Sequence, residues 1–289
     1  KWPFYSLVIA GVINVGLNLL LVIGFEMSVA GVAIATVVSN IVNAAIIVGF
    51  LTHEKGIFRL KLKKLSVSKP ELRKILQIGV PAGIQGMVFS ISNVFVLATI
   101  NSFGSAAVAG SSAALNYEYY CYFVVSAFAQ AAVAFISQNY GAGKIERCKN
   151  IFRQSMLLGL LGCAFLNLLI VWQKEFFIGF FTSEPDIVRY AAIRMEYVLL
   201  FQFMASSYEI SGAALRGLGY SMTPTVLTIF GTCLLRLVWI FVVVPMSRSY
   251  ETLLTVYPIS WVITGIAVCT AYAIIRRKAF SLPATQTTF

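Results

Sequence analysis

The chain has 289 residues, of which 59% are hydrophobic and only 11% are charged, and its mean hydropathy is +0.84. A soluble domain is about 45–50% apolar and about 25% charged, so this composition excludes an ordinary soluble protein. The net charge of +11 indicates membrane topology and contact with anionic lipid rather than nucleic-acid binding, because the basic residues are dispersed over separate loops.

Long apolar runs follow one another along the chain and predict an all-α polytopic membrane protein. A β-barrel is disfavoured because the runs lack alternation of polar and apolar residues. Pro81 and Pro258 lie inside two of the predicted helices and are expected to bend them. The eight predicted membrane helices are Pro3–Phe25, Gly31–Leu51, Ile75–Ile100, Ala106–Asn139, Cys148–Gln173, Ile187–Arg216, Pro224–Val244 and Thr252–Ile275.

A basic linker, residues 52–74, separates the second predicted helix from the third. It holds eight Lys or Arg residues and two Glu residues. Seventeen of the 22 basic residues fall on the linker's side of the membrane, so the positive-inside rule places the linker and both termini in the cytoplasm. We therefore expect a multi-pass protein of the cell (inner) membrane. Within the linker, Gly56–Leu65 alternates apolar and basic residues and is expected to lie on the inner leaflet.

The first two predicted helices resemble the last two at an offset of 221 residues. Pro3 then matches Pro224, and Ser39 matches Ser260. Any two hydrophobic hairpins look somewhat alike, but transporters are often built from repeated halves. A repeat predicts four further helices before residue 1, giving twelve in all. Residues 1–51 would end the N-terminal lobe, 52–74 would be the linker, 75–278 a six-helix C-terminal lobe, and 279–289 a cytoplasmic tail.

Four segments carry a family resemblance. They are IGVPAG at 78–83, INSFGSAAVAG at 100–110, SQNYGAGKIER at 137–147 and GAALRGLG at 212–219. In this order and spacing, they resemble the multidrug and toxic compound extrusion (MATE) family over nearly the whole chain. The resemblance implies two six-helix lobes related by a pseudo-two-fold axis along the membrane normal. The present chain would supply the fifth to twelfth helices.

The resemblance also implies a function. MATE-like proteins export organic, often cationic, compounds by alternating access, in exchange for inward flow of Na⁺ or H⁺. The expected partners are then small organic cations or drugs, membrane lipids and the four preceding helices of the same protein. No enzyme activity and no nucleic-acid partner is expected. No cofactor is expected either, and the coupling ion is Na⁺ or H⁺.

Ionisable residues within membrane helices are costly and are functional candidates by default. Glu118 lies about 18 Å into the fourth predicted helix. Its neighbours Asn116, Tyr117 and Tyr120 are polar or aromatic, so this stretch is a candidate for binding a cation, including Na⁺ near Glu118. The alternative is that Glu118 is a hydrogen-bonded packing residue and that the tyrosines form an interfacial belt.

Two further candidates are Glu209 in the sixth predicted helix and Arg236 in the seventh. They are predicted either to pair with each other as a structural ion pair or to act in coupling and substrate binding. Gln85 is the polar candidate of the third helix. Arg194 and Glu196 lie near the outer end of their helix and are expected to be solvated or to snorkel.

Two other functions compete with multidrug antiport. A flippase for lipid-linked precursors shares the helix count and the lobes, but the acidic character of Glu118 and Glu209 suits a cation better than a pyrophosphate headgroup. An intramembrane enzyme is disfavoured because no helix carries paired acids, a His cluster or a nucleophile with its base.

Overall fold

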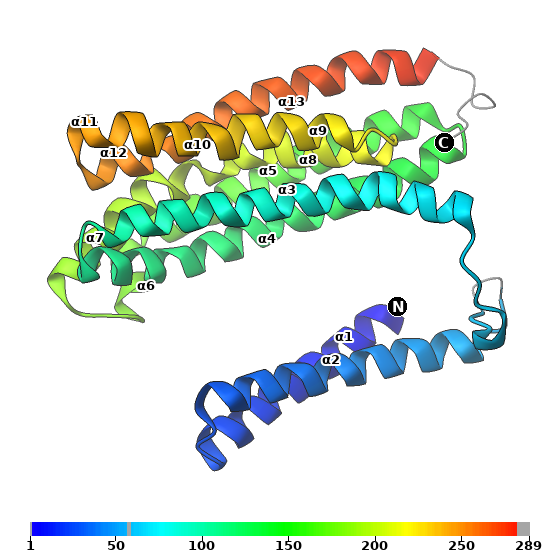
Figure 1. Ribbon diagram of the computed structural model, residues 1–289, viewed down its shortest axis with the longest axis horizontal. Coiled ribbons are helices and arrows are strands. Elements are labelled where there is room, and N and C mark those ends of the chain that lie inside the picture. Colours follow the sequence, from blue (N-terminus) through cyan, green and yellow to red (C-terminus); the bar gives the residue numbers. More distant parts are fainter. Residues whose placement is uncertain (1, 57–58, 282–289) are drawn as a thin grey trace. The chain divides into compact units, whose positions relative to one another are not determined.

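The computed structural model describes residues 2–56 and 59–281, and within these ranges all regular structure is helical. Eight helical segments are long and apolar enough to cross a membrane, as the sequence predicts. By its internal contacts the chain divides into two compact units, residues 1–69 and 70–289 (Figure 1).

The N-terminal unit contains a helical hairpin. α1 (Trp2–Asn18) continues as the π-helical segment η1 (Leu19–Gly24), and α2 (Ser28–His53) returns alongside it. Asn14 Nδ2 donates a hydrogen bond to Ser39 Oγ across the hairpin at 3.1 Å. Gly31 allows close approach near the turn, where an added Cβ would lie 3.1 Å from Leu21 Cβ. The pair is thus held by one polar contact and by close packing.

The linker is shorter than predicted. α2 runs to His53, and α3 (Lys69–Asn101) begins six residues before the predicted start at Ile75. Pro70 and Glu71 explain the early start, because proline and an acidic side chain both favour the first turn of a helix. Among the described residues between α2 and α3, the regular structure is one short 3₁₀ turn, η2 (Leu62–Lys64). Ile57 and Phe58 lie outside the described residues, and the linker's place on a leaflet stays a prediction.

The C-terminal unit begins with three long helices. α3 is followed by α4 (Ser105–Gly141) and α5 (Ile145–Trp172), joined by tight turns in which Gly104 and Gly143 have positive φ. Such angles favour glycine. α3 continues through Pro81 without interruption. The short helix α6 (Lys174–Gly179), which was not predicted, then leads to the sixth span.

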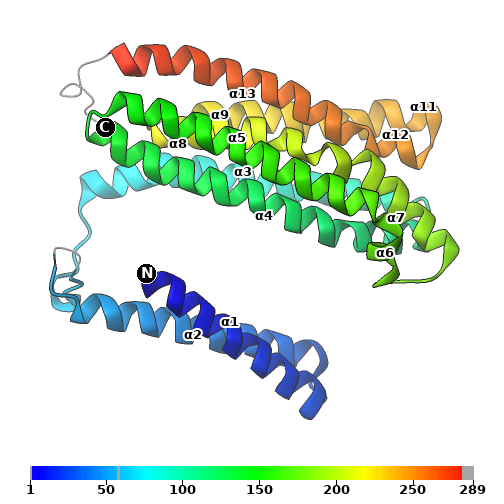
Figure 2. The ribbon, with the colours of Figure 1, turned by 180° about the vertical axis from the view of Figure 1, so that it is seen from behind.

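The sixth span is interrupted, although a continuous helix was predicted. It consists of α7 (Pro185–Tyr197), the 3₁₀ segment η3 (Leu199–Met204) and α8 (Ala205–Gly217). α8 lies at the centre of the unit and packs against α4, α5, α9 and α13 (Figure 2). Small residues of α8 allow the neighbouring helices to pack closely against it. At Gly217, an added Cβ would lie 3.1 Å from Ile136 Cβ of α4.

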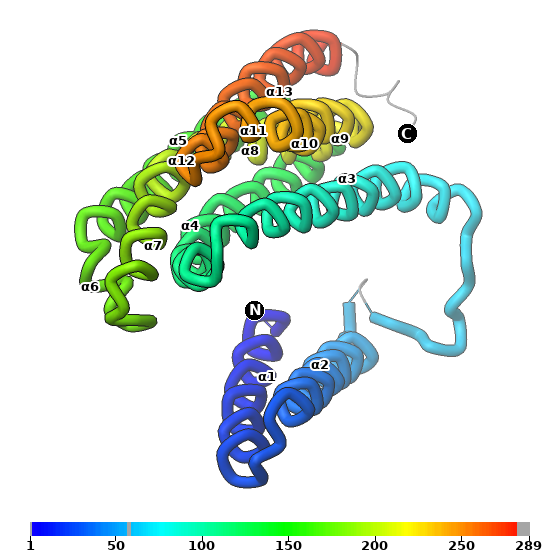
Figure 3. Tube along the Cα trace, turned by 60° about the vertical axis from the view of Figure 1, so that its left-hand side comes forward, coloured from blue at the N-terminus to red at the C-terminus, as the bar shows by residue number. Residues whose placement is uncertain are grey.

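The last two spans also change helix type along their length. The seventh comprises α9 (Met222–Thr228), η4 (Ile229–Leu234), α10 (Leu235–Val238), η5 (Trp239–Val243) and α11 (Val244–Ser247), where η4 and η5 are π-helical. The eighth comprises α12 (Tyr250–Leu254) and α13 (Val256–Ser281). The disturbance expected at Pro258 appears as the break at Thr255, because proline has no N–H to donate to Leu254. Figure 3 shows these segments as one tube.

The first and seventh spans share local features at the predicted offset of 221 residues. Shifted by this offset, η1 corresponds to residues 240–245, which overlap η5. The turns that follow both contain residues with positive φ, Glu26 and Ser28 in one and Arg248 in the other, although the offset does not place these residues at matching positions. Positive φ is uncommon outside glycine. These features support the predicted repeat.

We expect Gly110→Ala to destabilise the protein by about 1–3 kcal/mol, because overpacking forces the backbone to shift. An added Cβ at Gly110 in α4 would lie 2.7 Å from the Ile187 carbonyl oxygen and 2.8 Å from the Ala191 nitrogen of α7. Thermal unfolding in detergent measures the effect. Gly162→Ala in α5 is the matched control, since its added Cβ would make only an ordinary contact with Val124 at 3.4 Å. Equal unfolding midpoints for both variants would contradict this packing.

Candidate functional site

A buried ion pair joins α4 to α7. Arg194 Nε donates to Glu118 Oε1 at 2.6 Å, and Arg194 Nη2 donates to Glu118 Oε2 at 3.0 Å. The two side chains are only 4% and 8% exposed. This bidentate geometry is the strongest form of the arginine–carboxylate contact. The sequence singled out Glu118, and the structure supplies its partner.

Polar and aromatic groups surround the pair. Gln202 of η3 donates from Nε2 to the backbone oxygen of Glu118 at 2.9 Å. The Tyr257 ring of α13 lies 5.5 Å from Arg194 Cζ, within cation–π range. The side chains that meet here come from α4, α7, η3 and α13, so the ion pair lies where four segments converge. Sequence reasoning missed Tyr257, which sits in an apolar helix without a polar pattern around it.

The expectation that Arg194 is solvated or snorkels is wrong. The helix repeat explains the difference, because residues two apart point about 200° apart around a helix. Arg194 faces α4 and is buried, whereas Glu196 faces away. As expected, Glu196 is partly solvated, with its side chain 44% exposed, and it pairs with Lys174 of α6.

The predicted ion pair between Glu209 and Arg236 is not formed. Arg236 is buried and its Cζ lies 4.3 Å from the Tyr257 ring and 5.6 Å from the Phe89 ring. Its Nη1 donates a long hydrogen bond, 3.4 Å, to Asn93 Oδ1. Its Nε has no hydrogen-bond partner among the described residues. Arg236 is therefore held in an aromatic cage and lacks a carboxylate partner there.

Glu209 faces α4 instead. Its carboxylate accepts one long hydrogen bond, 3.5 Å, from the Tyr122 hydroxyl, and its side chain is half-buried within the sixth span. The guanidinium of Arg216 lies farther along α8, with its Nη1 3.6 Å from the position of a Cβ on Gly212. Within residues 2–56 and 59–281, no basic group forms an ion pair with Glu209. Its carboxylate therefore keeps capacity for a further cation.

The structure separates the candidates around Glu118. Tyr117 is buried, and its hydroxyl donates to the Phe177 carbonyl oxygen at 2.7 Å. Tyr120 is 63% exposed and Asn116 is exposed one turn earlier. Because both Glu118 oxygens already accept bonds from Arg194, the predicted Na⁺ near Glu118 would compete with that guanidinium. No cluster of three or more His, Cys, Asp or Glu residues suited to a metal is found in the described chain.

Gln85 marks a polar stripe on α3. Gln85, Phe89 and Asn93 are spaced four residues apart and therefore share one face. Gln85 Oε1 accepts from Thr225 Oγ1 of α9 at 3.3 Å, while Phe89 and Asn93 contact Arg236. The stripe thus links α3 to the seventh span and positions the aromatic cage of Arg236.

We expect Arg194→Gln to destabilise the protein by about 3–5 kcal/mol, because it leaves a buried charge without a partner. The double variant Glu118→Gln/Arg194→Gln should cost less than the sum of the two single variants. Unfolding in detergent, arranged as a double-mutant cycle, measures the coupling. Lys174→Gln breaks the partly exposed pair with Glu196 and should cost at most about 1 kcal/mol. If Arg194→Gln cost no more than Lys174→Gln, the pair would not hold the site together.

Comparisons with known proteins identify the family. The MatE family model matches residues 81–242, which is more than half of the chain. The chain is 27% identical to the probable multidrug resistance protein YoeA of Bacillus subtilis over 239 residues, covering 80% of this chain and 51% of that protein. It is also 27% identical over 219 residues to the probable multidrug resistance protein NorM of Thermotoga maritima, covering 76% of this chain and 47% of that protein. The chain spans about half the length of these curated relatives.

Solved structures show the same fold. A crystal structure of MATE in complex with MaL6 superposes with a TM-score of 0.84 at 18% identity, covering 95% of this chain and 63% of that one. The crystal structure of the Vibrio cholerae MATE transporter VcmN in the bent form superposes with a TM-score of 0.77 at 18% identity. The match covers 96% of this chain and 63% of that one. These likenesses agree with eight helices of a twelve-helix fold. The chain therefore belongs to the MatE family, and it is a multi-pass membrane protein with the MATE fold.

Proposed function

We propose that the protein is a secondary antiporter that exports organic, often cationic, compounds in exchange for Na⁺ or H⁺ by alternating access. The observation that carries the proposal is Glu209, a half-buried carboxylate in a membrane span without an ion-pair partner in the described chain. The names of the relatives, multidrug resistance proteins, support the substrate class.

Glu209 couples the two flows through a single negative charge. An ionised carboxylate is costly inside a membrane protein, so the site favours having a bound cation or proton. One carboxylate is neutralised by one such partner at a time. A cationic substrate and the coupling ion therefore exclude each other, which is the condition for exchange. The Tyr122 hydroxyl orients the carboxylate through its hydrogen bond.

Glu118 takes a different part in this proposal. Arg194 already neutralises it, so the pair fixes α4 against α7 while Glu209 exchanges ions. Glu118 stays the second candidate for coupling, and an exchange there requires Arg194 to release it.

Substrate contact is assigned to the exposed face of α4. Asn116, Tyr119, Tyr120 and Phe123 share one side of the helix by their spacing, and each of them is exposed. Tyrosine and phenylalanine rings attract organic cations through their faces. We assign this face to the substrate path and place the basic end of the unit in the cytoplasm of the cell (inner) membrane.

We expect Glu209→Gln to abolish ion-coupled ethidium efflux, because the amide neither ionises nor binds a proton at this position. Ethidium uptake into everted vesicles, which corresponds to export from the cell, measures this with an imposed Na⁺ or pH gradient. The vesicles come from cells that make the full-length protein. Glu196→Gln is the matched control and should transport normally, since Glu196 lies in the same span but is partly solvated. Normal coupled efflux by Glu209→Gln would remove Glu209 from the mechanism. Efflux by the unaltered protein with both gradients collapsed would refute antiport.

We expect Tyr120→Ala to raise the KM for ethidium several-fold while Tyr120→Phe stays near normal. The reason is that a cation–π contact at an exposed site contributes about 0.5–1 kcal/mol and needs only the ring. Phe165→Ala is the control, because Phe165 is equally exposed but lies on α5. The KM values come from initial efflux rates in the same vesicles. Equal KM values for Tyr120→Ala and Phe165→Ala would exclude Tyr120 from substrate binding.

One observation favours the alternative, a flippase for lipid-linked precursors. Arg236 is buried, and its Nε has no hydrogen-bond partner in the part of the chain that the structure describes, which suits an anionic group on a substrate. Transport of a fluorescent lipid-linked pyrophosphate into proteoliposomes distinguishes the two functions. Movement of that lipid, lost in Arg236→Gln, together with absent ethidium efflux, would favour the flippase.

A further inference from the structure

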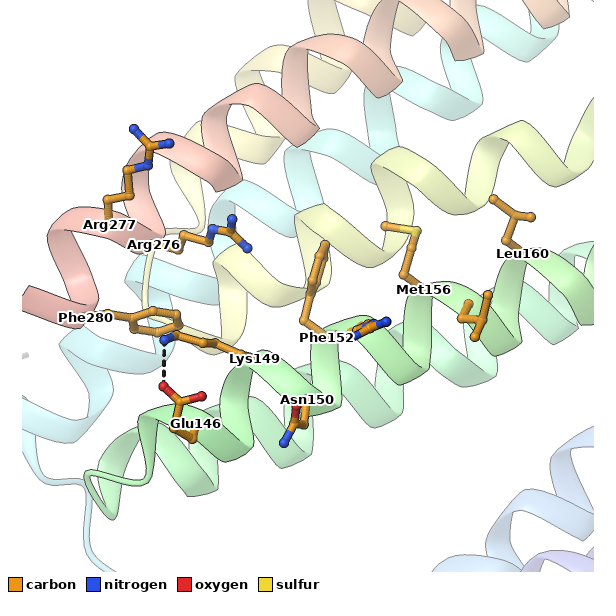
Figure 4. A pocket seen from close by; sticks show the side chains of 11 residues that line it. Glu146, Lys149, Asn150, Phe152, Met156, Leu160, Arg276, Arg277 and Phe280 are labelled. Atoms are coloured by element: carbon orange, nitrogen blue, oxygen red, sulfur yellow. Dashed lines mark hydrogen bonds and ion pairs between the residues drawn. The ribbon is translucent and has the colours of Figure 1, made fainter.

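A concave site lies away from Glu118 and Glu209, between α5 and α13 near the end of the unit where basic residues gather (Figure 4). Its volume is about 820 Å³. Both bounding helices also pack against α8. Its lining residues are Glu146, Lys149, Asn150, Phe152, Arg153, Met156, Leu157, Leu160, Arg276, Arg277 and Phe280.

The lining is divided into a charged half and an apolar half. Glu146, Lys149, Asn150 and Arg153 line it along the first turns of α5, and Met156, Leu157 and Leu160 line it along the next turns. Their spacing of three and four residues places them on one helix face. From Arg153 to Leu160 the helix rises by about 10 Å. The pocket therefore passes from a polar entrance to an apolar groove.

The charged half is strongly basic. Lys149, Arg153, Arg276 and Arg277 line it, against the single acid Glu146, whose carboxylate is 2.7 Å from Lys149 Nζ. Aromatic rings position two of these cations. Lys149 Nζ lies 6.0 Å from the Phe280 ring centre and Arg276 Cζ lies 5.6 Å from that of Tyr272. Such a lining repels an organic cation, so it is not the drug site, and it attracts an anion.

A ring contact joins the two helices beside the pocket, between Phe152 of the lining and Tyr272 of α13. The Phe152 and Tyr272 rings lie 4.1 Å apart between centres, at an angle of 30°. Beyond the apolar half, Leu161 and Phe165 of α5 are 54% and 66% exposed and continue the apolar surface along the helix. An alkyl chain leaving the groove therefore finds further apolar surface in the direction of the membrane core.

We propose that this pocket binds an anionic phospholipid of the surrounding leaflet. Its phosphate and headgroup lie among Arg153, Arg276 and Arg277, and one acyl chain lies along Met156, Leu157 and Leu160. The charged half selects the phosphate, as basic pockets between membrane helices do. The apolar half selects a lipid over a free phosphate compound, since a free anion would leave that half of the pocket unfilled.

Native mass spectrometry of the purified full-length protein in detergent tests the site. Phosphatidylglycerol and phosphatidylcholine with identical acyl chains are titrated, and we expect retention of the anionic lipid to be at least about tenfold stronger. Arg153→Gln/Arg276→Gln should remove this preference. Arg147→Gln/Lys278→Gln is the matched control, because it removes the same charge from exposed residues of the same two helices that do not line the pocket. If both double variants lost the preference for phosphatidylglycerol to the same extent, the proposal of a specific site would be overturned.

The apolar half is tested by Leu160→Trp, which fills the groove and leaves the basic residues in place. We expect it to weaken phosphatidylglycerol binding and to leave any binding of glycerol 3-phosphate unchanged. Competition by glycerol 3-phosphate as strong as that of the lipid would identify a free-anion site and overturn the lipid assignment. Unfolding midpoints of all variants, and the charge-keeping Arg153→Lys/Arg276→Lys, separate lost binding from lost folding. Because binding is measured without transport, failure here leaves the antiport proposal untouched.

Discussion

The buried ion pair between Glu118 and Arg194 constrains the rest of the C-terminal unit. Two charges removed from water require close geometry and further polar neighbours to be tolerated. The neighbours found here are Gln202, which bonds the backbone of Glu118, and Tyr257, whose ring lies beside Arg194. Since these groups come from different segments, α4, α7, η3 and α13 must keep one arrangement for the pair to persist.

The neutralised pair leaves other charges available for function. Tyr257 connects the Glu118–Arg194 pair to Arg236, because its ring contacts both arginines. Arg236 and Glu209 are each held by weak or aromatic contacts instead of by each other. Separate, incompletely satisfied charges of opposite sign suit the proposed binding and release of ions, whereas a closed ion pair suits a structural role. The π-helical segments beside Arg236 fit this view, since such segments are frequent at functional sites.

Much of the fold follows from composition and apolar run length. Eight long apolar stretches allow little except eight spanning helices, because the membrane interior requires every backbone hydrogen bond to be made within the helix. Helix boundaries were harder to place. The early start of α3 at Lys69 was hidden by the surrounding basic residues, which also suit a linker. The 3₁₀ interruption at Leu199–Met204 contains neither Pro nor Gly, so no local signal marked it.

The sequence by itself marked Glu118, Glu209 and Arg236 as charges inside the membrane, because they stand out in apolar helices, but it did not mark Arg194 as buried. Only the tertiary structure decided how these charges are partnered. Glu118 binds Arg194, 76 residues away, and Arg236 meets rings from α3 and α13. Partner choice depends on helix rotation and on which helices pack side by side. Both are set by long-range packing of small and large side chains, and periodicity within one helix does not contain that information.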